Sequence, residues 1–176
     1  MIKTKFTKSA MENEEGMNHL WIQIAPIGQA DQVHVQIVLP AGVHRLHNLS
    51  GFPETAAKEI QLPNPLAAAD LVIELFTRDP VMPGEKTVIV ALTYKDSEGK
   101  HSRLEHYVPL SILAEEESDS LLVDEEAVAY IKELLLHRGL EHKTFIDYSK
   151  TPVIRIDPNK YSDLEKKYRI EGELYE

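Results

Sequence analysis

The chain of 176 residues contains no cysteine, and this absence excludes several kinds of site at once. Disulfide bonds, thiolate nucleophiles, zinc ribbons and iron–sulfur clusters all require cysteine. A small domain that folds without a disulfide is compatible with the cytoplasm, so we expect a cytoplasmic protein. Glycine is also scarce, with eight residues scattered among turns, and neither Gly-rich phosphate-binding motif is present.

Basic residues are outnumbered, because nineteen lysines and arginines stand against twenty-nine aspartates and glutamates, a net charge of -10. A surface with this charge repels the phosphate backbone of nucleic acids, so we expect no nucleic-acid partner. No segment reaches the roughly 18 apolar residues that a membrane-spanning helix needs, and the N-terminus lacks the apolar stretch of a signal peptide. The sequence therefore predicts no membrane span and no export.

The sequence does contain a series of short stretches in which apolar and polar residues alternate. In residues 32–39, Val33, Val35 and Ile37 recur at every second position, which is the period of a half-buried strand. Similar stretches occupy residues 20–25, 59–62, 71–77, 87–94 and 104–113, and turns containing proline or glycine separate them. This series of short strands predicts a β-sandwich or a β-barrel.

Three of these stretches carry further detail. Gly99 can adopt the positive φ that closes a hairpin, so the strands on either side of it should pair antiparallel. Pro109 has no backbone N–H, which predicts that residues 104–113 lie at a sheet edge or contain a bulge there. Residues 20–25 (LWIQIA) carry no charge and no proline, so we expect this strand to lie inside a sheet or to be covered.

The composition changes after residue 113. Seven acidic residues and no basic residue lie between positions 114 and 126, which is typical of a solvated linker. From Asp124 onward, apolar residues recur every three or four positions, and this predicts a helix with Asp124 as its N-cap and Gly139 as its C-cap. Residues 144–156 are interpreted as a hairpin and residues 161–168 as a short helix.

These patterns predict a mainly β chain in which a β-sandwich is followed by a small α+β unit of αββα order. The divisions are residues 1–16 as an N-terminal segment that could be flexible, 17–116 as the sandwich, 117–126 as an acidic linker and helix start, and 127–176 as the C-terminal unit. That unit is too small to be stable alone, so we expect it to lean on the sandwich or on a second chain. The second of these alternatives would make the chain a homodimer.

The order of features in residues 71–112 resembles bacterial immunoglobulin-like sandwiches of the cell-adhesion-related type. The similar features are a turn before a strand (Pro83, Gly84 and Glu85), a strand end (Tyr94), a hairpin (Gly99) and a last strand (residues 108–112). The resemblance implies an immunoglobulin-like fold and a general role in binding. It implies no catalytic or cofactor-binding residue.

The eight histidines are the first candidates for site chemistry. His44 and His47 have a spacing that would place both rings on one metal ion if their loop formed a helical turn, with Asp31 or His34 joining across the sheet. Two histidines without a third ligand at a defined spacing are more often solvent-facing loop residues. His106 lies in phase with the apolar residues of its stretch, which predicts a neutral core ring hydrogen-bonded to the backbone.

No signature of a Ser-His-carboxylate triad is present, and the paired carboxylates lack EF-hand spacing. Residues 48–50 form an N-x-S glycosylation sequon, which has little meaning without export. We therefore expect a protein that is not an enzyme and has no cofactor, namely an interaction module that presents an edge strand and loops to a protein partner. The alternative is a small ligand- or metal-binding protein that uses His44 and His47.

Overall fold

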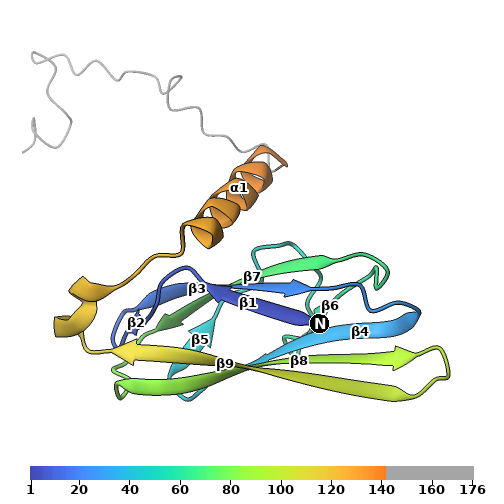
Figure 1. Cartoon of the computed structure of the whole chain (residues 1–176), viewed down its shortest axis with the longest axis horizontal. Helices are drawn as coiled ribbons and strands as arrows, with labels where there is room; N and C mark the ends of the chain where they lie inside the picture. The colour runs from blue at the N-terminus through green and yellow to red at the C-terminus, as the bar shows by residue number, and fades with distance from the viewer. Residues whose placement is uncertain (142–176) are drawn as a thin grey trace, which may run out of the picture. The chain divides into compact units, whose positions relative to one another are not determined.

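The structure is a computed structural model that describes residues 1–141 of the chain. The hairpin predicted at residues 144–156 and the helix predicted at 161–168 lie outside the described residues, and so does most of the predicted αββα unit. The described part is mainly β (Figure 1). No helix within it has the length and hydropathy that crossing a membrane requires.

All six predicted strand stretches are present, with ends shifted by a few residues. The elements in chain order are β1 (Ile2–Phe6), β2 (Met11–Glu12), β3 (Met17–Ile24), β4 (Ala30–Val38), β5 (Val43–Arg45), β6 (Ile60–Gln61), β7 (Ala69–Thr77), β8 (Gly84–Asp96), β9 (His101–Leu113), the 3₁₀ helix η1 (Glu115–Ser120) and the helix α1 (Glu125–Glu141). Strands β1, β2 and β5 were not predicted.

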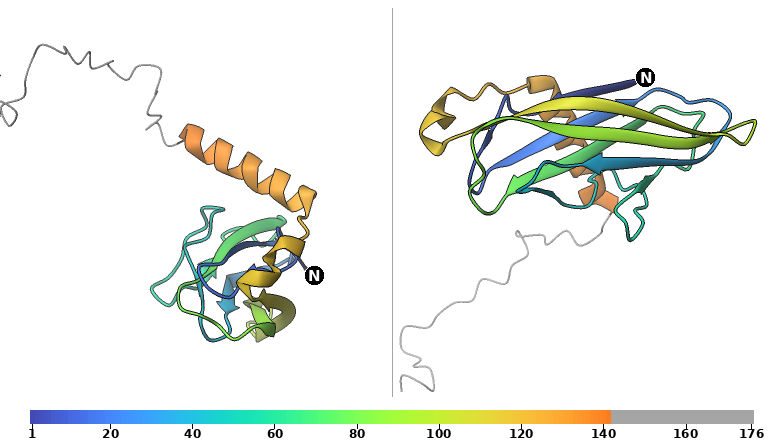
Figure 2. Two further views of the ribbon diagram at one scale, coloured as in Figure 1. Left: turned by 90° about the vertical axis from the view of Figure 1, so that its left-hand side faces the viewer. Right: turned by 90° about the horizontal axis from the view of Figure 1, so that it is seen from below.

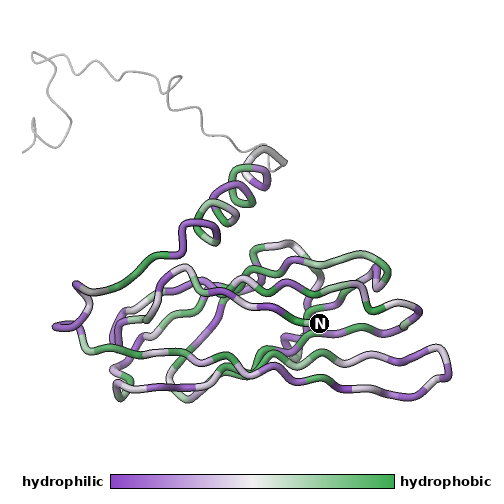
Figure 3. The backbone as a smooth tube through the Cα atoms, in the orientation of Figure 1, coloured by the Kyte–Doolittle hydropathy of each residue, from purple (hydrophilic) through white to green (hydrophobic). Residues whose placement is uncertain are grey.

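The strands form two sheets that share one core. The first sheet has the order β1-β3-β7-β5, and the second has the order β2-β9-β8-β4-β6. Hydrophobic and hydrophilic positions alternate along the strands (Figure 3), so each sheet turns one apolar face inward. Fully buried core residues come from both sheets, and they include Leu20, Ile22, Leu71, Ile73, Leu75, Val35, Val90, Leu92, Leu110 and Ile112.

Strand β3 contains LWIQIA and lies between β1 and β7, which confirms that this uncharged stretch is inside a sheet. Trp21 points to the outer face, where it packs against α1. The helix α1 lies on this side of the sandwich (Figure 2). The ring of Tyr130 stacks on Trp21 with centroids 4.3 Å apart and planes 9° apart. Ala127 and Ile131 pack against the same place, and Trp21 Nε1 donates a hydrogen bond to Asp70 Oδ1 at 2.9 Å. The helix therefore packs on the sandwich, which is the first of the two expected positions for the C-terminal unit; the rest of that unit lies outside the described residues.

The predicted N-cap of α1 is confirmed and the predicted C-cap is wrong. Asp124 Oδ1 accepts a hydrogen bond from the backbone N–H of Ala127 at 2.9 Å. The helix continues past Gly139 to Glu141, because glycine permits a left-handed stop but does not impose one. Near this end, the Arg138 guanidinium donates to the backbone oxygen of Leu49 and so attaches the last turns to the sandwich.

Residues 1–16 and the acidic segment after residue 114 are joined to each other and to the sheets. The N-terminal segment supplies β1, which pairs with β3, and β2, which pairs with β9. The Ser9 N–H donates to Leu122 O at 2.8 Å, and the Asp124 N–H donates to Thr7 O at 2.9 Å. The backbone is thus paired while the glutamates of η1 remain exposed, and sandwich and helix form one compact unit.

The hairpin between β8 and β9 closes at Gly99. Its φ is 82°, which confirms the predicted positive φ. The Asp96 N–H bonds to Lys100 O at 3.0 Å, so these residues form a hydrogen-bonded pair. Because such pairs alternate along an antiparallel ladder, the even-numbered residues of β9 bond to β8 and the odd-numbered ones face away. Pro109 is odd-numbered, so its missing N–H costs no bond to β8. Within residues 1–141, the outer side of β9 pairs with β2 at Ile112 and Leu113 alone, so the predicted edge position holds for the part of the strand before these residues.

His106 is not a core residue, contrary to its apolar phase. The side chain is half-buried, and its Nε2 lies 3.2 Å from the hydroxyl of Thr4 in β1, not from a backbone group. Strand β9 is an edge, so its inward-facing residues near the hairpin are only partly covered. The contact joins β1 of the first sheet to β9 of the second sheet.

Replacing Ala127 with aspartate should detach α1 from the sheet, because Ala127 is fully buried and a carboxylate there has no partner. The expected cost is at least about 2 kcal/mol. Trp21 is the only tryptophan of the chain, so its fluorescence should shift to longer wavelength as Tyr130 leaves it. Ala129→Asp is the matched control, since Ala129 is exposed on the same helix. Equal emission spectra from the two variants would contradict the packing.

Candidate functional site

The predicted histidine pair does not form a helical turn, because residues 43–45 are the extended strand β5. His44 lies against Phe76 of β7, with ring centroids 5.6 Å apart. His47 follows the strand, and its Nδ1 lies 3.3 Å from Glu54 Oε1. His34 of β4 instead lies near Glu59, at 4.0 Å between Nδ1 and Oε2. Asp31 is exposed at the start of β4, and no group of three His, Asp or Glu side chains within residues 1–141 is arranged to hold a metal ion.

A buried ion pair lies beside His47. The side chains of Arg45 and Glu54 are 4% and 3% exposed, and Nη2 and Oε2 are 3.1 Å apart. Glu54 Oε1 also accepts hydrogen bonds from the backbone N–H of Asn48 at 2.6 Å and from its side-chain amide at 2.8 Å. Burial alone would raise the pKa of Glu54, but hydrogen bonds from Arg45 and Asn48 and the charge of Arg45 outweigh it and lower this pKa. Glu54 therefore acts as a carboxylate that fixes the loop after β5.

Asn48, in the loop after β5, is the asparagine of the N-x-S sequon. The residue as a whole is 4% exposed. Its Nδ2 donates to the backbone oxygen of Phe52 at 2.8 Å, and its Oδ1 accepts from the Phe52 N–H at 3.0 Å. The amide is thus fully engaged across the turn. In the folded chain it is a structural residue and is inaccessible for modification.

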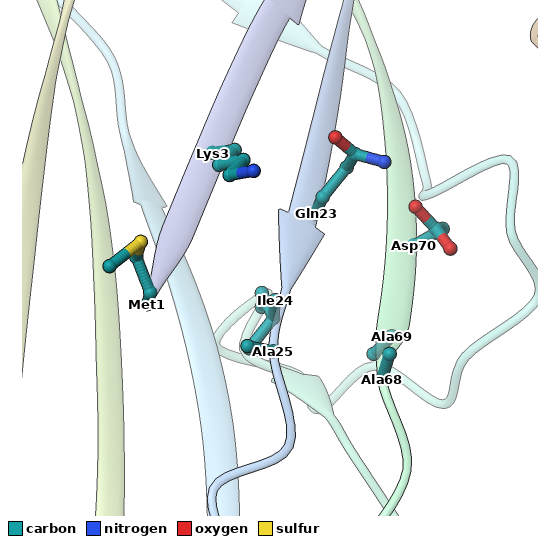
Figure 4. Close-up of a pocket in the computed structure, with 8 residues that line it drawn as sticks. All are labelled: Met1, Lys3, Gln23, Ile24, Ala25, Ala68, Ala69 and Asp70. Carbon is teal, nitrogen blue, oxygen red and sulfur yellow. The ribbon is translucent and has the colours of Figure 1, made fainter.

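A hollow of about 440 Å³ lies at one end of the first sheet (Figure 4). Its polar side chains, Lys3, Gln23 and Asp70, come from β1, β3 and β7 and stand opposite one another in the strand register. Asp70 already accepts the hydrogen bond from Trp21. The hollow therefore borders the area that α1 covers, and its carboxylate belongs to the contact that holds the helix.

The outer face of the second sheet is open in the described structure. In the right-hand view of Figure 2, β8 and β9 lie in front and α1 lies behind them. Val38, Ile89 and Tyr107 form one cross-strand row on β4, β8 and β9, which we call the Tyr107 row. Val38 is 39% exposed and Tyr107 is 61% exposed. An apolar and aromatic row beside an unpaired strand edge is typical of an interaction surface.

Polar contacts hold the exposed side chains of β9 in place. Arg103 Nε donates to Glu105 Oε1 at 2.8 Å, and the Tyr107 hydroxyl donates to Glu105 Oε2 at 2.8 Å. The hydrogen bonds from Arg103 and Tyr107 lower the pKa of Glu105, and the bond to the carboxylate raises the pKa of Tyr107. At neutral pH the edge therefore presents a positive, a negative and a neutral aromatic side chain at successive odd-numbered positions.

Neither the ion pair nor the Tyr107 row was predicted from the sequence. Arg45 and Glu54 belong to no periodic pattern, so no local signal relates them. Tyr107 could have been found, because it lies out of phase with the apolar residues of its stretch and in phase with Arg103 and Glu105. An aromatic residue on the polar face of a predicted edge strand is such a signal.

No protein-family model matches the chain, and no curated protein matches it at a significant level. Two structures of BcpA, the major pilin subunit of Bacillus cereus, are partly similar. A variant form is 9% identical with a TM-score of 0.45, and the other form is 11% identical with a TM-score of 0.39. Each match covers 65% of this chain and 40% of the pilin chain, so this chain spans about two fifths of the pilin's length.

Replacing Glu54 with glutamine should lower the free energy of unfolding by about 3 kcal/mol at pH 7, because Arg45 loses its buried counter-charge. The pKa of Glu54 is lowered in the folded state, so its contribution is present above the unfolded pKa of about 4.3 and is lost as the pH falls through the folded pKa. Urea unfolding should therefore show a smaller difference between the variant and the natural sequence at pH 3 than at pH 7.

Glu59→Gln is the control for this experiment, since the Glu59 side chain is 41% exposed. Its effect should stay within about 0.5 kcal/mol at both pH values. A difference between Glu54→Gln and the natural sequence that grows toward acid would contradict the assignment of Glu54 as a stabilising carboxylate.

Proposed function

We propose that the chain is an immunoglobulin-like sandwich that acts as a non-catalytic protein interaction module. The strand order supports the fold assignment. The first sheet, β1-β3-β7-β5, follows the order A-B-E-D, and β4-β8-β9 of the second sheet follows the order C-F-G. Strands β2 and β6 extend the second sheet at its two ends, and α1 is an addition on the outer face of the first.

The observation that carries the proposed function is the difference between the two outer faces. One large outward aromatic residue of the first sheet, Trp21, is stacked under Tyr130 and 6% exposed. The second sheet has its outward aromatic residue, Tyr107, 61% exposed in an apolar row. Burial of a tyrosine and its aliphatic neighbours is a common source of binding energy in protein interfaces, so the open face is the one suited to a partner.

The edge of β9 adds a second means of recognition to this face. Its unpaired backbone groups can accept a strand from another chain, and the side chains of Tyr107 and its row lie directly beside that edge. Backbone pairing supplies general affinity in such complexes, whereas the side-chain row supplies selectivity. A partner that uses both would contact β9 along its length and the adjoining surface of β8 and β4.

A photoreactive phenylalanine analogue at position 107 should form covalent adducts with a protein partner when cells that naturally contain the protein are irradiated. The same analogue at Lys132 should form none, because Lys132 is exposed on α1, away from the open face. Gel electrophoresis and mass spectrometry identify the adducts. The absence of adducts at position 107, or equal adducts at both positions, would overturn the proposed function.

A further inference from the structure

The free side of β9 presents a regular row of backbone hydrogen-bonding groups. Within residues 1–141, no strand pairs with this side between His101 and Leu110. The N–H and C=O groups of the odd-numbered residues point toward it, and the first missing donor is at Pro109. An uninterrupted stretch of seven residues, 101–107, is therefore available for pairing with another strand.

The side chains along this stretch are arranged in a self-complementary way. Charged residues on an edge strand ordinarily oppose pairing, since two copies of the strand bring like charges together. Here Arg103 and Glu105 have opposite charges and are both exposed. Between them lies Leu104, an apolar residue that is 49% exposed. The edge thus offers an attractive pairing to a copy of itself, provided that the register is correct.

Symmetry restricts the register. Two antiparallel β9 strands related by a two-fold axis place each residue opposite one whose number mirrors it about the centre. A centre at Arg103 or at Glu105 brings that charge against its own copy, which is unfavourable. A centre at Leu104 places Arg103 opposite Glu105 of the other copy at two symmetric positions. It also brings the two exposed leucines together and leaves Pro109 outside the paired stretch.

We propose that the partner of the β9 edge, which borders the open face, is a second copy of the chain, joined through antiparallel pairing of the two β9 edges with Leu104 on the two-fold axis. The inference rests on the proposed function and names its partner. In this register the odd-numbered residues 101–107 exchange backbone hydrogen bonds, and His101 of one copy stands opposite Tyr107 of the other. The dimer is reversible, because a seven-residue edge is a small contact.

The absence of cysteine allows a direct test in the full chain. Residues opposite each other in a non-hydrogen-bonded pair have Cα atoms about 4.5 Å apart, which a disulfide can span. Leu104→Cys should therefore give a covalent dimer under mild oxidation. Ser102→Cys should stay monomeric, because position 102 stands opposite His106 of the other copy and about 13 Å along the strand from its own copy. Cross-linking at position 102, at both positions or at neither would overturn the register.

Charge reversal tests the same register without a covalent bond. Arg103→Glu should raise the dimer dissociation constant about tenfold, because two attractive pairs become repulsive. Adding Glu105→Arg to Arg103→Glu should restore the dimer, since positions 103 and 105 face each other across the axis. Sedimentation equilibrium measures both effects. A double variant that remains as weak as the single one would overturn the proposal.

The two proposals fail in different ways. A chain that is monomeric at all concentrations and still forms adducts with another protein at position 107 would overturn the second-copy partner and leave the proposed function standing. A chain that forms no adducts at position 107 would overturn the proposed function itself. Adducts between two copies of the chain at position 107, together with the Leu104→Cys cross-link, would support both.

Discussion

The stacking of Tyr130 on Trp21 determines where the helix α1 covers the first sheet. It attaches α1 to the first sheet, with Ala127 and Ile131 filling the space around the indole ring. The hydrogen bond from Trp21 Nε1 to Asp70 fixes the orientation of the indole ring. The middle of this outer face is therefore covered by the chain itself, whereas no such cover lies on the second sheet within residues 1–141.

The elements that the sequence predicted are those whose signal is local. Strands β4, β7 and β8 show the two-residue period over seven or more residues, and the Asp124 cap lies directly before its helix. Strand β1 (IKTKF) shows the same period, but residues 1–16 were interpreted as a terminal segment and the period was missed. Strand β2 has two residues, so only its pairing with β9 defines it as a strand. The same limit explains Gly139, because a glycine permits a helix to stop but does not impose the stop, and α1 continues through it to Glu141.

The site could be predicted only in part, for a related reason. The spacing of His44 and His47 brings two rings together in a helix, but β5 is extended, and the rings meet Phe76 and Glu54 instead. Whether a short loop is helical or extended is decided by its neighbours, in this case the pairing of β5 with β7. The edge position of β9 was predictable because Pro109 carries that information in its own covalent structure.

The parallel pairing of β2 with β9 has a consequence for synthesis of the chain on the ribosome. It joins Met11 and Glu12 to residues about one hundred positions later, whereas the β8–β9 hairpin is formed from neighbouring segments. The N-terminal strands therefore leave the ribosome long before the last strand exists, and the core residue Met11 must wait for it. Nascent chains that have not yet reached β9 are thus the stage at which this protein is most exposed to chaperones and to aggregation.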